Sequence, residues 1–329
     1  MLSKVFVSVA CALLLFSASA QAKTGYVKLG KGAEVYINYD APAAGEPTVV
    51  LLNGLTYSLG DWDEYVKALK KLNPGLGILR FDMIGMGRTL LKGKLPVDYA
   101  IPHTAQVELT SHLMKALGVG RAYIAGLSYG GGIAVAFASA HPEQVEQVIL
   151  MAPFTEPMKA MDQWIRLQVA TNRFTVPFNP ASEDELYDWF LRNFIYASYP
   201  SLEPSVVENP YKLEGVFRMI QGIRHYDTLK DASNLPEGST HLMVATQDQY
   251  IEGEVLDRFW NAIPRASRAS RINISRSTHK IPEEIPAFAA AWTIQILSQR
   301  TELNRGLVFT GNTVEFNAKN GSTVIQLQK

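Results

Sequence analysis

Short apolar runs alternate with amphipathic stretches along most of the chain. The apolar runs predict strands at 48–53, 77–82, 122–126, 145–153, 241–248 and 270–275. Helical spacing of the apolar residues between them predicts helices at 61–72, 104–118, 252–262 and 283–299, and another from the end of the third run to Ala140. Apolar strands that alternate with helices are typical of a mostly parallel sheet with helices on both faces. The chain is therefore expected to have an α/β fold.

Three stretches depart from this alternation. At 26–39 apolar and polar positions alternate on both sides of a Gly-Lys-Gly turn, which predicts an N-terminal hairpin. The stretch 154–236 is rich in Trp, Tyr, Phe and Pro and has helical spacing at 156–173 and 183–199, so we expect a helical cap insertion. After Gly306, the turn dipeptides Gly311-Asn312 and Asn320-Gly321 separate alternating runs, which predicts a C-terminal β meander over 306–329. The remaining segments, 23–153 and 237–305, are expected to form one core.

Residues 1–22 have the features of a secretory signal. Lys4 precedes the apolar run Val5–Phe16, and small residues follow at the expected cleavage site. The run is too short to cross a membrane as a helix. The alternative is a buried N-terminal helix. We expect a secreted or periplasmic protein whose mature chain has no membrane span, and no thiol or disulfide, because Cys11 lies inside this segment.

Charge gives no reason to expect nucleic acid as a partner. The chain has 31 Lys and Arg against 31 Asp and Glu, and removal of the signal would take away only Lys4. The one concentration of basic residues is more typical of a solvated loop and strand face than of an anion site. Its members are Arg265, Arg268, Arg271 and Arg276.

One serine stands among glycines at the end of an apolar run. Gly126-Leu127-Ser128-Tyr129-Gly130 has small residues two positions before and two after the serine, as a sharp turn from strand to helix requires. Such a turn exposes the hydroxyl and directs the free N–H groups of the following helix at the reaction. We therefore expect Ser128 to be a nucleophile. One alternative is an ordinary glycine-rich turn. Another is a phosphate-binding loop, but the Gly-Lys-Ser/Thr sequence of such loops is absent here.

A serine nucleophile requires a base and an acid that orients it. His279 lies between the last core strand and the final helix, where a loop could reach Ser128, and His225 at the exit of the insertion is its main rival. Asp248 ends a predicted strand, although it could instead cap the next helix, and Glu156 follows another strand. The other four histidines are less suitable by position: His103, His112, His141 and His241.

Two backbone N–H groups are expected to form an oxyanion hole. One belongs to Tyr129, directly after the serine, and the other to Leu55, after the bend at Gly54. Asp82 is expected to support this edge of the sheet, with Gly85 and Gly87 forming its loop.

With these residues placed, the chain from about 26 to 300 resembles the α/β-hydrolase superfamily, in the serine-nucleophile branch with a helical cap. The similarity depends on "LLNGL", "RFDMIGMGRT", "GLSYGG", "ATQDQY" and "STHKIPEEIP". It implies a triad and an oxyanion hole at the residues that match the family's: Ser128, Asp248, His279, Leu55 and Tyr129. Two positions depart from the family pattern. This chain has Asn53-Gly54 where the family often has His-Gly, and Thr278-His279 where the family usually has Gly-His. The second departure is tolerable unless position 278 requires a positive φ.

The resemblance implies hydrolysis of a small-molecule acyl ester without a cofactor or a bound metal. Members with an aspartate nucleophile are excluded by Ser128. Several alternatives stay open for a serine nucleophile on this fold: hydrolysis of an amide, thioester or C–C bond, perhydrolysis, and peptidase or acyltransferase activity. A non-catalytic secreted binding protein is a further alternative. The aromatic content of the cap indicates an apolar substrate pocket that includes Trp164 and Trp189, although such spacing is also typical of simple packing.

Overall fold

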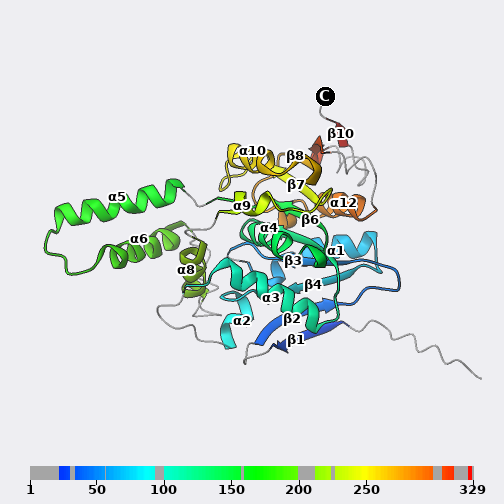
Figure 1. Cartoon of the computed structure of the whole chain (residues 1–329), viewed down its shortest axis with the longest axis horizontal. Coiled ribbons are helices and arrows are strands. Elements are labelled where there is room, and N and C mark those ends of the chain that lie inside the picture. The colour runs from blue at the N-terminus through cyan, green and yellow to red at the C-terminus, as the bar shows by residue number, and fades with distance from the viewer. Residues whose placement is uncertain are drawn as a thin grey trace, which may run out of the picture.

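The computed structural model describes residues 22–29, 34–55, 57–92, 100–156, 159–198, 212–223, 227–298, 306–314 and 325–327. Within these ranges, ten strands form one sheet in the order β1-β2-β4-β3-β5-β6-β7-β8-β9-β10 (Figure 1). Pairing is parallel from β4 through β3 to β9 and antiparallel at both ends. The strands are β1 Lys23–Lys28, β2 Glu34–Asp40, β3 Thr48–Leu52, β4 Gly77–Phe81, β5 Ala122–Leu127, β6 Val145–Met151, β7 Thr240–Ala245, β8 Arg268–Ser275, β9 Leu307–Asn312 and β10 Ile325–Leu327.

Helices connect these strands and cover the sheet. The α-helices are α1 Asp63–Leu72, α2 Gly87–Lys92, α3 His103–Ala116, α4 Tyr129–Ala140, α5 Lys159–Thr175, α6 Glu183–Ser198, α8 Lys212–Ile223, α9 Thr228–Ala232, α10 Gly253–Ala262, α11 Ile281–Glu284 and α12 Pro286–Leu297. Short 3₁₀ turns lie at η2 Leu59–Trp62, η3 Pro142–Gln144 and η4 Arg265–Ser267. The predicted α/β fold with a mostly parallel sheet is confirmed.

Both faces of the sheet are buried. In β3, Val50 and Leu52 belong to the apolar layer that contains residues of α3 and α4, whereas Val49 and Leu51 belong to the layer that contains residues of α1 and α12. Successive strand residues point to opposite faces, so a strand covered on both sides must be apolar throughout. This is why the core strands are uninterrupted apolar runs in the sequence.

The two ends of the sheet are antiparallel. The predicted N-terminal hairpin is present, with Lys23 opposite Tyr39 in β1 and β2. At the other end β9 pairs in parallel with β8, and β10 pairs antiparallel with β9, so the C-terminal β structure continues the main sheet.

The turn predicted at Gly311-Asn312 is wrong, because both residues lie inside β9. A Cβ at Gly311 would stand 2.4 Å from the ring of Phe288 on α12. This glycine therefore allows a strand and a helix to pack closely, and it does not reverse the chain. The second predicted turn, Asn320-Gly321, lies outside the described residues.

The stretch predicted to form a cap contains α5, α6, α8 and α9. Helices α5 and α6 lie side by side and extend away from the sheet (Figure 1). Ile165 on α5 and Leu191 on α6 are both buried. Among the described residues no helix has both the length and the apolar character needed to cross a bilayer. Residues 1–21 lie outside the described residues, so the signal segment stays a prediction.

Candidate active site

The sheet order brings the ends of three strands together. Ser128 directly follows β5, Asp248 follows β7, and His279 follows β8. Strands β5, β6, β7 and β8 are consecutive neighbours and all parallel. Their carboxyl ends therefore lie at one edge of the sheet, where ligands bind in open α/β folds.

Ser128 has a strained backbone. Its φ of 52° and ψ of −117° lie in a region that residues with a side chain rarely adopt. Both of its peptide groups are held: the N–H donates to Met151 O at 3.0 Å, and the carbonyl accepts from Gly132 N and Phe154 N. The surrounding hydrogen bonds therefore maintain the conformation that a strand-to-helix turn with an exposed serine requires.

The glycines around Ser128 allow this turn. A Cβ at Gly126 would stand 2.3 Å from the carbonyl oxygen of Gly130, and a Cβ at Gly130 would stand 2.1 Å from that of Leu52. A Cβ at Gly131 would meet Pro153 at 2.7 Å. Each of these separations is shorter than a non-bonded contact, so the chain passes where any side chain would collide.

His279 and Asp248 form the predicted pair. His279 Nδ1 lies 2.8 Å from Asp248 Oδ2, and the two side chains are 11% and 2% exposed. The other oxygen, Oδ1, accepts from the backbone N–H groups of Tyr250 and Ile251 at 2.8 and 2.9 Å. An imidazole that donates Nδ1–H to a carboxylate has its lone pair at Nε2, which is the atom that a base requires. Asp248 does not cap α10, whose N-cap is Glu252.

The rival acid is engaged elsewhere. Glu156 forms a two-point ion pair with Arg258, with both oxygens 3.2 Å from guanidinium nitrogens. Of the rival histidines, His225 lies outside the described residues. His112 is exposed, His141 contacts Glu108, and His241 is buried against Ser270.

The loop after β3 lies against the start of α4. The carbonyl oxygens of Leu52 and Asn53 stand where a Cβ of Gly130 would be, at 2.1 and 2.6 Å. The Leu55 backbone, two residues beyond Asn53, and the N–H of Tyr129, the first residue of α4, thus belong to adjoining segments. Burial raises the pKa of the Tyr129 phenol, so its side chain stays neutral. Within the described ranges no group of three or more His, Cys, Asp and Glu side chains is placed to hold a metal ion.

A family model for the alpha/beta hydrolase fold matches residues 47–265, which is more than half of the chain. The chain belongs to this family. The match includes Leu55, Ser128, Tyr129 and Asp248, and His279 lies beyond its end.

The chain is similar to proteins that are named as hydrolases. It is 30% identical over 125 residues to a 2-hydroxy-6-oxononadienedioate/2-hydroxy-6-oxononatrienedioate hydrolase of Paraburkholderia phymatum, over 36% of this chain and 41% of that one. It is 27% identical over 135 residues to a 2-hydroxymuconate semialdehyde hydrolase of Pseudomonas sp. strain CF600, over 39% and 46%. The chain thus spans less than half the length of these curated relatives.

A solved structure shares the fold over most of its length. An alpha/beta hydrolase from a Medee basin deep-sea metagenome library superposes with a TM-score of 0.60 and 20% identity, over 81% of this chain and 95% of that one. At this identity the likeness concerns the fold alone.

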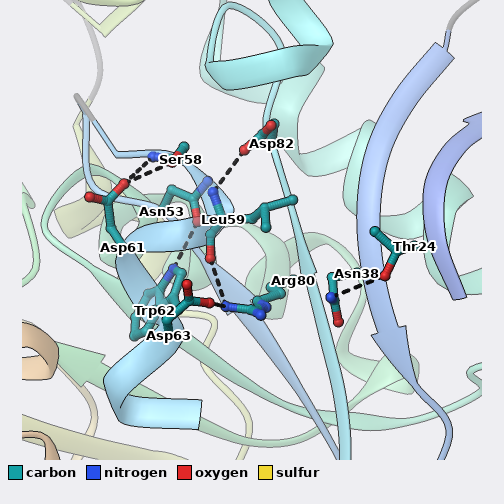
Figure 2. Close-up of polar contacts among 10 residues, drawn as sticks. All are labelled: Thr24, Asn38, Asn53, Ser58, Leu59, Asp61, Trp62, Asp63, Arg80 and Asp82. Atoms are coloured by element: carbon teal, nitrogen blue, oxygen red, sulfur yellow. Dashed lines mark hydrogen bonds and ion pairs between the residues drawn. The ribbon is translucent and has the colours of Figure 1, made fainter. Parts of the chain in front are cut away.

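Buried polar side chains support the loop that follows β3 in this member of the family (Figure 2). Asn53 stands where the family often has histidine, and it donates to Phe81 O at 3.0 Å and accepts from the Trp62 indole at 2.8 Å. Asp82 accepts from Leu59 N and Arg88 N at 2.7 and 2.8 Å. Burial raises the pKa of Asp82, and these backbone donors oppose the effect. The supporting role predicted for Asp82 agrees with these contacts.

Glu284 holds the loop of the histidine, a contact that no motif in the sequence indicates. Thr278 donates its backbone N–H to Glu284 Oε2 at 3.0 Å and its hydroxyl to Oε1. The non-glycine residues with positive φ among those described are Ser128, Ala152 and Arg276. Position 278 therefore does not require glycine, and the departure from the family's Gly-His is accommodated.

The predicted pocket residues Trp164 and Trp189 lie on the α5–α6 hairpin. They are 44% and 57% exposed, and their rings pack on Phe194 and Phe190 respectively. Tyr250 instead lies against the site, with its ring edge-on to His279 at 5.1 Å. The sequence hint for Tyr250 is its position two residues after Asp248. A pocket at the two tryptophans stays a prediction.

Proposed function

We propose that this hydrolase cleaves carboxylic esters through an acyl-enzyme on Ser128, with His279 as the base and Asp248 as the acid that orients it. The observation that carries the proposal is the buried 2.8 Å Asp248–His279 pair at the sheet edge where Ser128 is held in a strained turn. Backbone strain of this kind clusters at functional sites, and a serine nucleophile needs a base that a third group orients.

The reaction proceeds in two halves. Ser128 Oγ attacks the ester carbonyl while His279 Nε2 takes its proton, and the N–H groups of Leu55 and Tyr129 stabilise the oxyanion. The C–O bond then breaks, and the imidazolium protonates the leaving alcohol. Water attacks the acyl-enzyme with the same histidine as base, which releases the acid and restores Ser128.

The proposed substrates are small to medium uncharged acyl esters. The chain has equal numbers of acidic and basic residues, so no long-range attraction favours a polyanion. An apolar acyl pocket gains roughly 0.8 kcal/mol for each buried methylene. The value of kcat/KM should therefore rise a few-fold per added carbon until the pocket is full.

Active-site labelling and an ester panel test this proposal. A fluorophosphonate should label the wild-type protein and leave Ser128→Ala unlabelled. On acetate to decanoate esters, Ser128→Ala should lose activity on the order of 10⁶-fold, the scale of loss in a serine protease that lacks its serine. Half-normal activity in a purified, folded Ser128→Ala protein would show that the nucleophile lies elsewhere.

C–C bond hydrolysis is a second candidate, favoured by the names of the relatives. The Paraburkholderia phymatum relative is named for a dienedioate, which is a dicarboxylate. A dicarboxylate substrate is expected to need cations at the site. Arg258 is paired with Glu156, and Lys280 lies 3.6 Å from Glu283, so these two nearby cations are already engaged. We therefore rank the ester first on the contact of Lys280, the residue next to His279. Faster turnover of a 2-hydroxy-6-oxo-dienedioate than of any uncharged ester would reverse this order.

A further inference from the structure

Among the described residues, most of the large apolar side chains that are exposed lie on the α5–α6 hairpin. Two phenylalanines are the most exposed, Phe174 at 88% and Phe178 at 94%. Phe174 lies in the last turn of α5, and Phe178 lies in the segment that joins α5 to α6. This segment is at the end of the hairpin that lies furthest from the sheet (Figure 1). We call residues 172–181 the hairpin tip. Among the hairpin residues whose burial the structure describes, the exposed large apolar side chains are Trp164, Leu167, Phe174, Val176, Phe178 and Trp189.

The polar groups of the hairpin tip bond to one another. Val176 and Asn179 donate their backbone N–H groups to the carbonyls of Asn172 and Val176, at 2.8 and 3.0 Å. Ala181 donates to the Asn179 side chain at 3.0 Å. Pro177 and Pro180 have no N–H group. The tip thus combines exposed apolar side chains with a backbone that is largely bonded internally, as insertion into a lipid layer requires.

The charged residues near the hairpin tip indicate which kind of lipid surface it could bind. The hairpin tip contains one charged residue, Arg173, which donates to the carbonyls of Asn179 and Ala181. Three exposed acidic residues follow the tip at the start of α6, Glu183, Asp184 and Glu185. These carboxylates would be repelled by anionic headgroups. A surface with no net charge is therefore the better match.

We propose that the hairpin tip inserts Phe174, Val176 and Phe178 into the interfacial layer of an electrically neutral lipid surface. Aromatic and apolar side chains on a short protruding element are suited to this layer, and no membrane-spanning helix is required. The binding depends on apolar area, so salt should not weaken it. The inference is independent of the reaction at Ser128.

Sedimentation with sucrose-loaded phosphatidylcholine vesicles tests this inference on the full chain. We expect Phe174→Ser/Phe178→Ser to lower the partition coefficient at least about tenfold, because two exposed rings are lost. The control Leu72→Ser removes a 51% exposed leucine from α1 and should partition like the wild type. Both variants should keep wild-type turnover of a water-soluble ester. Should the double variant fail to fold, Phe178→Ser alone serves in the same assay.

Four results would overturn the inference. The first is no binding of the wild type to phosphatidylcholine vesicles, and the second is equal binding by the double variant. The third is binding only after phosphatidylglycerol is added, which would mean that anionic headgroups drive it. The fourth is a wild-type dimer in the absence of lipid that the double variant converts to monomer, because the tip would then be an interface between copies of this chain.

Discussion

The two halves of the candidate site are held in place by different means. Ser128 is positioned by backbone segments that approach more closely than any side chain allows, at Gly126 and Gly130. His279 is positioned by hydrogen bonds to carboxylate side chains. Its ring bonds to Asp248, and the neighbouring Thr278 donates to Glu284. We call these the nucleophile half and the acid–base half.

This difference predicts that substitutions in the two halves change different properties of the protein. In the nucleophile half even one added methyl group must displace the backbone, so substitutions should affect folding. In the acid–base half a substitution of similar size leaves the packing unchanged and removes an acceptor. It should therefore affect turnover more than stability, although a buried donor left unpaired costs about 1–3 kcal/mol. Three measurements test this distinction and a fourth tests the acid sensitivity of the fold, from the largest expected effect to the smallest.

Asp248→Asn should have the largest effect on turnover. The amide cannot hold the imidazole in the required tautomer, and the same change in a serine protease costs about 10⁴-fold in kcat. Glu156→Gln is the matched control, because its carboxylate is paired with Arg258. Steady-state kinetics on one ester compares the two variants. A greater loss in Glu156→Gln would move the acid to the end of β6.

Gly130→Ala should lower the free energy of unfolding by about 3 kcal/mol, the upper end of ordinary overpacking costs. The new Cβ would stand 2.1 Å from Leu52 O, and a backbone carbonyl cannot move aside as a flexible side chain can. Gly120→Ala is the control, because nothing lies within 4 Å of its Cβ. Denaturant titration measures both. Equal stability of the two variants would contradict steric positioning of the nucleophile half.

Glu284→Gln should lower kcat about tenfold with KM unchanged, because the loss of one charge-assisted hydrogen bond is worth roughly 1.4 kcal/mol. Glu284 accepts both donors of Thr278, whereas an amide presents only one acceptor atom to them. Thr278→Val should have a smaller effect, since its backbone N–H still donates. The control is Glu254→Gln, an exposed position on α10. A fall in melting temperature without a fall in kcat would assign Glu284 to folding alone.

His241 should make the stability of the whole fold sensitive to acid. It lies on β7, and burial lowers its pKa to about 3. The unfolded histidine binds a proton near pH 6.5 and the folded one does not, so stability decreases as the pH falls from about 6.5 towards 3, by up to about 1.4 kcal/mol per pH unit.

His241→Gln should reduce this slope in melting temperature against pH. His112→Gln, at an exposed position on α3, should follow the wild type. Identical slopes in all three proteins would mean that other groups cause the acid sensitivity.

The sequence by itself determined the features that depend on local pattern. Apolar runs and helical spacing predicted the core strands and helices, because burial on both faces of a sheet must be encoded in the residues that are buried. The turn at Ser128 was also predictable, since its glycines lie within four residues of it. The loop around Asp82 was predictable for the same reason.

Only the tertiary structure decided the features that depend on which segments become neighbours. Asp248 and Glu156 both follow a core strand, and the fold brings Asp248 to His279 and Glu156 to Arg258. Gly311 resembles a turn glycine until Phe288 is seen against it. These contacts join residues far apart in the chain, and strand order and helix packing set them, so no local pattern can encode them.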